Sequence, residues 1–302
     1  MIISCAVDRR FCELAGVMLA SLFANGDIGD SRVIVFGYEL RRKDKERLRL
    51  SCGTERYRLE IIDVAASDPI LRWLATLWPK NSPALFTRLL IPIILGREND
   101  RLLFLDCDMV VLSSLRPLIE LELGECTIAA VPDSDAAHPK REAPGTRMSY
   151  PVDAPYFNAG LMLIDLPKWR ERNVTQRVFD VFEREGKRLR LADQDALNTA
   201  LIGQWKPLDL EWNVHPDIAE RLGTYDTARI IHFGGQTKPN SIECSSAQQP
   251  IYLHYRKLTP WNKLRLETAF DSRLARRKKH LARFWRKLTT RMRPTPSRPS
   301  AV

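Results

Sequence analysis

No apolar stretch in this 302-residue chain approaches the roughly 20 residues that a membrane-spanning helix requires. The N-terminal run MIISCAV has no basic leader before it, and Asp8 and Arg9 end it well short of the apolar core of a signal peptide. We therefore expect neither a spanning helix nor a secretory leader, and we expect the protein in the cytoplasm.

Paired cysteine motifs are also missing. The six cysteines are scattered, and none has the C-x-x-C spacing of zinc ribbons. This argues against the common zinc-binding modules and fits reduced thiols, so we expect no disulfide bonds.

Acidic residues are absent from the C-terminal end. Residues 272–302 hold 11 lysines and arginines and no aspartate or glutamate, which leaves 47 − 11 = 36 basic against 37 acidic residues in the rest. The formal charge of +10 therefore belongs to the tail, whereas a basic groove for nucleic acid should be spread over a folded face. We expect a main domain over residues 1–255, a basic helical extension over 256–302, and no nucleic-acid partner.

Apolar side chains in this extension recur at helical spacing. They form one stripe with Phe284 beside it, and lysines and arginines fill the other faces; the stripe is Leu274, Leu281, Trp285, Leu288 and Met292. Such a helix is suited to lie on an anionic membrane surface. We expect a peripheral anchor on the inner face of the cytoplasmic membrane, with a solvated tail docked on the body as the alternative.

Strand-like and helix-like patterns alternate through the first 110 residues. The expected strands are 2–7, 32–38, 58–64 and 100–106, and the expected helices between them are 11–26, 41–50 and 84–95. Beyond residue 124, the segment CTIAAV over 126–131, a long Pro-rich loop over 132–155 and a strand over 158–166 precede further helices. The alternation predicts an α/β domain with a largely parallel sheet, whose ligands bind beyond the carboxyl ends of the strands.

Two carboxylates interrupt an apolar run in FLDCDMVVL, residues 104–112. Asp106 and Asp108 lie at a strand end, and ionised carboxylates are costly to desolvate without a partner. Two hard oxygen donors suit Mg²⁺ or Mn²⁺ bridging the phosphates of a substrate. A tight turn would also explain the pair.

A second candidate is IIHFGGQTKP, residues 230–239, in which a strand delivers His232 into a Gly-rich turn. Imidazole suits Mn²⁺ as a third ligand, Gly234 and Gly235 let the backbone approach a phosphate, and Lys238 can meet its charge. A structural histidine with satisfied hydrogen bonds is the alternative.

Two polar clusters have simple local explanations. In ADQDALN, Asp193 opens a helix and is a candidate N-cap, and in YFNAGLMLIDL, Asn158 precedes an apolar strand and could end a turn. Neither residue indicates chemistry by itself.

Taken in order, these segments resemble the family 8 retaining glycosyltransferases, the group that includes glycogenin and bacterial lipopolysaccharide galactosyl- and glucosyltransferases. The resemblance covers roughly residues 2–240 and rests on AVD, ASLFAN, FTRLLIP, RLLFLDCDMVV, YFNAGLMLIDLPKWRERN, DQDALN and HFGGQTKP. It implies a GT-A fold, a Rossmann-like α/β domain that binds a nucleotide sugar and a divalent metal, usually Mn²⁺, with Mg²⁺ also possible.

The resemblance also implies roles for individual residues. The expected metal ligands are Asp106, Asp108 and His232, and the expected catalytic residues beside the donor sugar are Asp193 and Gln194. The remaining expected donor-binding residues are Ala6, Val7, Asp8, Phe11, Arg88, Cys107, Asn158, Gly235 and Lys238, with Asp133 or Asp135 as an addition. Asp8 and Phe11 fall where the family recognises and stacks the uracil.

The implied activity is transfer of glucose or galactose from a UDP-sugar to a saccharide or glycolipid such as lipopolysaccharide, with retention of the anomeric configuration. Gln194 stands at the obvious nucleophile position, and because an amide is a poor nucleophile we favour attack on the leaving-group face. The alternative is a catalytically inactive membrane- or nucleic-acid-binding module with a glycosyltransferase-like body. The intact D-x-D pair, His232 and Lys238 argue against that alternative.

Overall fold

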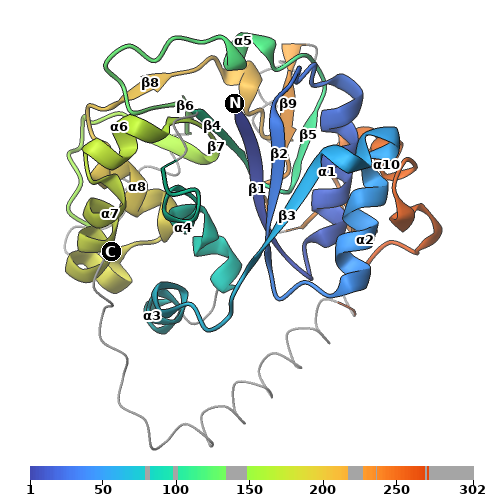
Figure 1. Ribbon diagram of the computed structural model, residues 1–302, viewed down its shortest axis with the longest axis horizontal. Coiled ribbons are helices and arrows are strands. Elements are labelled where there is room, and N and C mark those ends of the chain that lie inside the picture. Colours follow the sequence, from blue (N-terminus) through green and yellow to red (C-terminus); the bar gives the residue numbers. More distant parts are fainter. Residues whose placement is uncertain are drawn as a thin grey trace, which may run out of the picture.

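The computed structural model describes residues 1–78, 82–97, 101–133, 148–216, 227–235, 237–268 and 271. Their main sheet has the strand order β3–β2–β1–β4–β7–β6–β8 (Figure 1). Its strands are β1 (Ile2–Asp8), β2 (Arg32–Tyr38), β3 (Leu59–Val64), β4 (Arg101–Leu105), β6 (Ile128–Pro132), β7 (Phe157–Asp165) and β8 (Trp205–Pro207). A separate antiparallel pair consists of β5 (Met109–Val111) and β9 (Ile230–His232).

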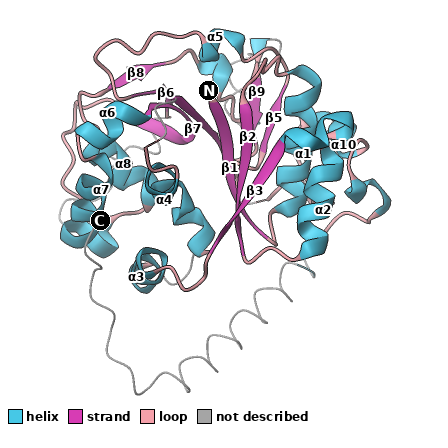
Figure 2. Cartoon of the chain, in the orientation of Figure 1, coloured by secondary structure: helices cyan, strands magenta, loops and turns pink. Residues whose placement is uncertain are grey.

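Helices cover both faces of the main sheet (Figure 2). One side carries α1 (Cys12–Asn25) and α2 (Arg42–Ser51), with α10 (Gln249–Arg256) packed on α1. The other carries α3 (Pro69–Leu77), α4 (Thr87–Ile94), α6 (Leu166–Glu171), α7 (Val174–Glu185) and α8 (Asp193–Ala200). The short elements are α5 (Arg116–Ile119), η1 (Gly53–Arg58), η2 (Pro83–Phe86), η4 (Gly186–Arg188), η5 (Leu210–Trp212) and η7 (Pro260–Lys263).

The central strand β1 shows why the sheet is covered on both faces. Ile3, Cys5 and Val7 belong to the core beneath α1, whereas Ile2 belongs to the core that includes α4 and α7. Successive side chains of a strand point to opposite faces, so a continuous apolar run such as IISCAV is buried on both. The expected strands and helices of the first 110 residues are confirmed, and their strands β3, β2, β1 and β4 are parallel neighbours.

The reversed strand β7 determines where the site is built. Because β7 runs antiparallel to β4, its N-terminal end lies at the edge where β4 ends, and Leu105 pairs with Leu161. Asp106 N–H donates to the Gly160 carbonyl over 2.7 Å. The pairing of β5 with β9 places Met109 opposite His232, so that three separate segments meet beyond the carboxyl end of β4.

The chain continues to pack on the body beyond residue 255. Arg256 Nε lies 2.7 Å from Glu13 Oε1, and the buried ring of Trp261 rests directly on Gly16 of α1. The expected amphipathic stripe, residues 274–292, lies outside the described residues. No helix within the described ranges is both long and apolar enough to cross a membrane.

Candidate active site

A pocket of about 940 Å³ opens beyond the carboxyl ends of β1 and β4. Its volume lies at the upper end of the roughly 300–1,000 Å³ typical of small-molecule sites. The expected site residues that line it are Ala6, Val7, Asp8, Phe11, Arg88, Asp106, Cys107, Asp108, Asp133, Asn158, Asp193, Gln194, His232 and Lys238. Gly235 is not among the lining residues although Gly234 is, and Asp135 lies outside the described residues.

Three potential metal ligands converge on this pocket. One ligand atom each from Asp106, Asp108 and His232 lies within 4.8 Å of the other two. His232 Nε2 is 3.7 Å from Asp106 Oδ2 and 3.4 Å from Asp108 Oδ1. Such separations are those of ligands that share an ion about 2.0–2.6 Å away, so two carboxylates and one imidazole fit a divalent cation.

Each carboxylate also has a cationic partner on its other oxygen. Arg88 Nη2 donates to Asp106 Oδ1 over 2.6 Å, and Lys238 Nζ donates to Asp108 Oδ2 over 2.6 Å. Burial by itself raises the pKa of Asp108, but the adjoining His232 and Lys238 overcome it and hold that pKa well below its usual range. Burial prevails at Asp106, whose pKa is raised despite Arg88. Asp108 is therefore ionised at neutral pH.

A glycine on β7 makes room for this cluster. A Cβ atom on Gly160 would lie 2.5 Å from His232 Cε1 and 3.0 Å from Asp106 Oδ2. Real Cβ atoms do not approach other atoms so closely, so any larger residue here would displace the ligands. Gly160 N–H also donates to Asn158 Oδ1 over 2.9 Å, which ties the glycine to its neighbour in the pocket wall.

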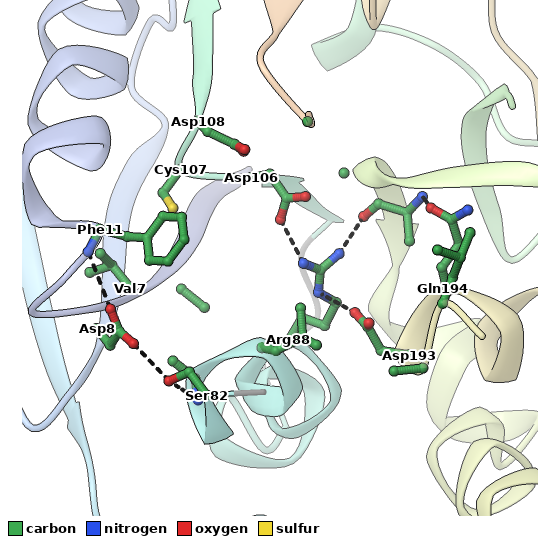
Figure 3. A pocket seen from close by; sticks show the side chains of 18 of the residues that line it. Val7, Asp8, Phe11, Ser82, Arg88, Asp106, Cys107, Asp108, Asp193 and Gln194 are labelled. Carbon is green, nitrogen blue, oxygen red and sulfur yellow. Dashed lines mark hydrogen bonds and ion pairs between the residues drawn. The ribbon is translucent and has the colours of Figure 1, made fainter. Parts of the chain in front are cut away.

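Arg88 connects Asp106 to the start of α8 (Figure 3). Its Nη1 donates to the Ala159 carbonyl over 2.8 Å, and its Nε lies 2.9 Å from Asp193 Oδ2. The guanidinium carbon also lies 4.7 Å from the centre of the Phe104 ring. Contacts on several sides fix this buried cation between Asp193 and Asp106.

The local explanations for Asp193 and Asn158 are both wrong. Ala192 is the N-cap residue of α8, and the Asp193 carboxylate is paired with Arg88 instead. Asn158 lies within β7 and lines the pocket, so it does not end a turn. Burial raises the pKa of Asp193 to about 6, against the opposing charge of Arg88.

The amide of Gln194 is held at both of its ends. Its Oε1 accepts from Ala159 N–H over 3.0 Å, and its Nε2 donates to Asp133 Oδ2 over 2.9 Å. Tyr156 Oη lies 3.3 Å from Nε2 as a second acceptor. The bound carbonyl oxygen is therefore turned toward the backbone of β7.

At another part of the wall, Asp8 organises the loop that leads into α1. Its Oδ1 accepts from the N–H groups of Arg10 (2.9 Å) and Phe11 (3.2 Å), and its Oδ2 accepts from Ser82 Oγ over 2.7 Å (Figure 3). Phe11 and Cys107 are both partly buried and line the pocket beside this loop. Asp8 therefore has structural bonds in addition to its expected role.

Several residues at the site carry no signal in the sequence. Ser82 and His215 line the pocket, and the His215 ring lies 4.5 Å from that of His232. Burial, together with His232, lowers the pKa of His215 to about 4, so its imidazole is neutral. Asn213 bonds to His232 from behind the pocket. Ser82 could have been noticed as the cap before Pro83, whereas WNVH, residues 212–215, matches no motif.

Comparison with known proteins identifies relatives that match most of the chain. General stress protein A of Bacillus subtilis is 30% identical over 278 residues, which cover 86% of this chain and 94% of that protein. The Lipopolysaccharide 1,2-glucosyltransferase of Escherichia coli is 28% identical over 92% of this chain and 85% of that protein. The Lipopolysaccharide 1,3-galactosyltransferase of Salmonella typhimurium is 26% identical over 86% of this chain and 79% of that protein.

The fold has a solved counterpart in the galactosyltransferase LgtC, crystallised in complex with donor and acceptor sugar analogues. The two structures align with a TM-score of 0.74 and 19% identity over 87% of this chain and 99% of that chain. This confirms the GT-A architecture expected from the sequence. A family model described as "Glycosyl transferase family 8" matches residues 2–241, which is most of the chain. The chain therefore belongs to glycosyl transferase family 8.

Proposed function

We propose that the protein is a retaining hexosyltransferase that moves glucose or galactose from a UDP-sugar to a saccharide or glycolipid, with Mn²⁺ as its metal and Mg²⁺ as a possible substitute. One observation carries the proposal. Asp106 Oδ2, Asp108 Oδ1 and His232 Nε2 face one another at the wall of a pocket large enough for a nucleotide sugar, while the other carboxylate oxygens bind Arg88 and Lys238.

This arrangement suits stabilisation of a leaving diphosphate. Cleavage of the sugar–phosphate bond builds negative charge on the departing oxygens, and a divalent ion held by the three ligands would supply positive charge there. Arg88 is fixed beside Asp106, and Lys238 is partly buried and reaches the pocket, so both add cationic charge on the same side. Ordered charges of this kind cost no reorganisation during the reaction.

Attack on the leaving-group face fits the position of Gln194. Its carbonyl oxygen already accepts a hydrogen bond from Ala159 N–H, which lowers its electron density, and the amide is further held by Asp133. A nucleophile would have to break these bonds before it reached the anomeric carbon. We therefore assign Gln194 and Asp193 to orienting the donor sugar, and Asp8 and Phe11 to the uracil end of the pocket.

The acceptor class is proposed from the relatives. Two curated relatives are named as lipopolysaccharide glycosyltransferases, one for glucose and one for galactose. A glycolipid acceptor lies at a membrane surface, which agrees with the proposal that the basic tail attaches the protein peripherally to the inner face of the cytoplasmic membrane. The sequence of residues 272–302 is the support for that attachment.

A donor and acceptor screen tests the function. Purified protein is given UDP-glucose, UDP-galactose or their N-acetyl forms, with and without Mn²⁺, and each donor is offered with lipid-linked and free saccharides. We expect Mn²⁺-dependent release of UDP with one hexose donor, even by slow hydrolysis when no acceptor is present. Failure to bind or turn over any donor with Mn²⁺ would favour the catalytically inactive module instead.

A further inference from the structure

A chain of buried amides lies behind the metal-facing histidine. Asn213 Oδ1 is 2.9 Å from His232 Nδ1, and Asn213 Nδ2 is 2.9 Å from Asn158 Oδ1. Asn158 Nδ2 in turn is 3.0 Å from Asp133 Oδ2. Asn213 is only 5% exposed and does not line the pocket, so it acts on a ligand only through its neighbours His232 and Asn158.

The direction of every bond in this chain follows from one backbone group. Gly160 N–H can only donate, and it donates to the Asn158 side-chain atom that also faces Asn213, so this atom is the carbonyl oxygen. The other end of the Asn158 amide is then its NH₂ group, which agrees with the carboxylate of Asp133 opposite it. The orientation of the Asn158 amide is thereby assigned from the hydrogen-bond network.

The same logic sets the proton on His232. Since Asn158 presents an acceptor, Asn213 must turn its NH₂ group toward it, and the Asn213 carbonyl oxygen then faces the imidazole. A carbonyl oxygen only accepts, so His232 Nδ1 carries a hydrogen, which leaves Nε2 as the ring nitrogen that can offer a lone pair to a metal. Nε2 lies 3.7 Å from Asp106 Oδ2 and 3.4 Å from Asp108 Oδ1, on the side where the ion would be held.

We propose that Asn213 is a positioning residue that selects the tautomer in which His232 can bind a metal through Nε2. Without the Asn213 carbonyl, a buried Nδ1–H would have no acceptor, whereas a proton on Nε2 could bond to Asp108 Oδ1, 3.4 Å away. The tautomer would then reverse, and the ligand atom would be blocked. The metal part of this inference rests on the proposed function, but the tautomer itself does not.

The tautomer is measured directly in metal-free protein. Histidine-selective ¹⁵N labelling, with correlation of ring nitrogens to ring protons at pH 8, distinguishes a protonated from an unprotonated nitrogen; His232→Gln identifies the signal. In the unaltered protein we expect the Nδ1–H form of His232, and in Asn213→Leu the Nε2–H form. An Nε2–H form in the unaltered protein overturns the proposal, and so does an unchanged tautomer in Asn213→Leu.

Metal affinity gives the second readout, by calorimetric titration with MnCl₂. We expect Asn213→Leu to bind Mn²⁺ about 10–100-fold more weakly, the usual loss when a partner behind a ligand is removed. Asn213→Asp keeps an acceptor toward Nδ1 although it loses the donor toward Asn158, so it should retain the Nδ1–H form and lose less Mn²⁺ affinity than Asn213→Leu. Equal losses in both variants would show that Asn213 supports only the fold. Absence of Mn²⁺ binding in every form would refute the proposed metal site, while the tautomer measurement still decides the role of Asn213.

A control variant at a distance separates this effect from general damage. Asn25 also joins elements through its amide, which donates to the Val111 carbonyl over 2.8 Å and to Tyr255 Oη over 2.7 Å. Asn25→Leu removes two hydrogen bonds but leaves the chain behind His232 intact. We expect the His232 tautomer and Mn²⁺ affinity to be unchanged in it, and a loss equal to that of Asn213→Leu would contradict the proposal.

Discussion

Asp106 and Asp108 each use one carboxylate oxygen to bind a cationic side chain, and the other oxygen of each faces His232. Arg88 and Lys238 neutralise the pair in the folded chain, which explains how two carboxylates one residue apart are tolerated beside the core. Arg88 also pairs with Asp193, so the candidate metal cluster and the start of α8 share one buried guanidinium. The function of these residues therefore depends on their pairing as much as on their own chemistry.

Asp193→Asn tests the proposed role of Asp193 in orienting the donor sugar. The change keeps the shape of the side chain and removes its charge toward Arg88, while Arg88 retains Asp106. We expect transfer to slow by about 100-fold because the donor sugar is misplaced, with UDP affinity, measured by calorimetry, within about threefold of the original. If UDP binding falls as far as activity, Asp193 is a structural residue.

The raised pKa of Asp193 predicts a pH effect on stability. Its pKa is about 6 in the folded protein and about 3.9 in an unfolded chain, so the folded state binds the proton more strongly between these values. Protonation therefore stabilises the fold, and this contribution is lost as the pH rises through 6. In metal-free protein, the gain in unfolding free energy from pH 7 to pH 5 should be about 1 kcal/mol smaller in Asp193→Asn. Denaturant titrations at both pH values measure it, and an equal gain in the two proteins contradicts the assignment.

The roles of single residues at the site were ambiguous in the sequence. The D-x-D pair was compatible with a turn, His232 with a structural role and Asp193 with a helix cap, because each reading depends on what lies opposite in space. The order of the motifs resolved the ambiguity, and the metal-like cluster of Asp106, Asp108 and His232 agrees with it. Asn213 escaped notice because its partner His232 is 19 residues away and no local pattern joins them.

Among the strands, β7 contributes its first residues to the pocket wall because it runs antiparallel to β4. Its first residues supply Asn158, Ala159 and Gly160 beside the end of β4, and Gly160 lies against both His232 and Asp106. The continuous apolar run predicted the strand well, since NAGLMLIDL is buried almost throughout. Its direction was not predictable, because a strand buried on both faces reads alike in a parallel or an antiparallel pairing.

Gly160→Ala tests this close approach. The added Cβ would overlap His232 and Asp106 in the folded chain, so the ligands must separate. We expect a loss of about 1–3 kcal/mol in unfolding free energy and Mn²⁺ affinity at least about 10-fold weaker. Thermal unfolding and calorimetric titration measure the two effects. Unchanged Mn²⁺ affinity in this variant would show that the three side chains do not act together as ligands.

In the whole molecule, the described chain continues to pack on the body beyond residue 255, where the expected main domain ends. Arg256 and Trp261 pack on α1, and Glu267 N–H donates to the Asn240 carbonyl, while the excess of basic residues begins only after them, from residue 272. Composition reports where charge changes, whereas packing follows single buried residues such as Trp261. The basic block from residue 272 stays a proposed membrane anchor.

Cosedimentation with vesicles tests that anchor. Full-length protein and a form ending at Asp271 are compared on anionic and neutral liposomes at two salt concentrations. We expect the full-length protein alone to pellet with anionic vesicles, because each cation of the tail near the surface adds about 1 kcal/mol at most. Pelleting should be weaker in high salt. Equal pelleting of the two forms on anionic vesicles would remove the anchor.

The proposed transfer from a UDP-sugar depends on a divalent ion held by Asp106, Asp108 and His232. The most direct measurement is UDP release from the preferred UDP-hexose by the original protein and by Asp108→Ala, each titrated with Mn²⁺ and with EDTA. We predict that EDTA abolishes release by the original protein and that Mn²⁺ restores it. Asp108→Ala should be about 1,000-fold slower at saturating Mn²⁺, since the ion carries several kcal/mol of leaving-group stabilisation. Full turnover by Asp108→Ala in EDTA would contradict the account.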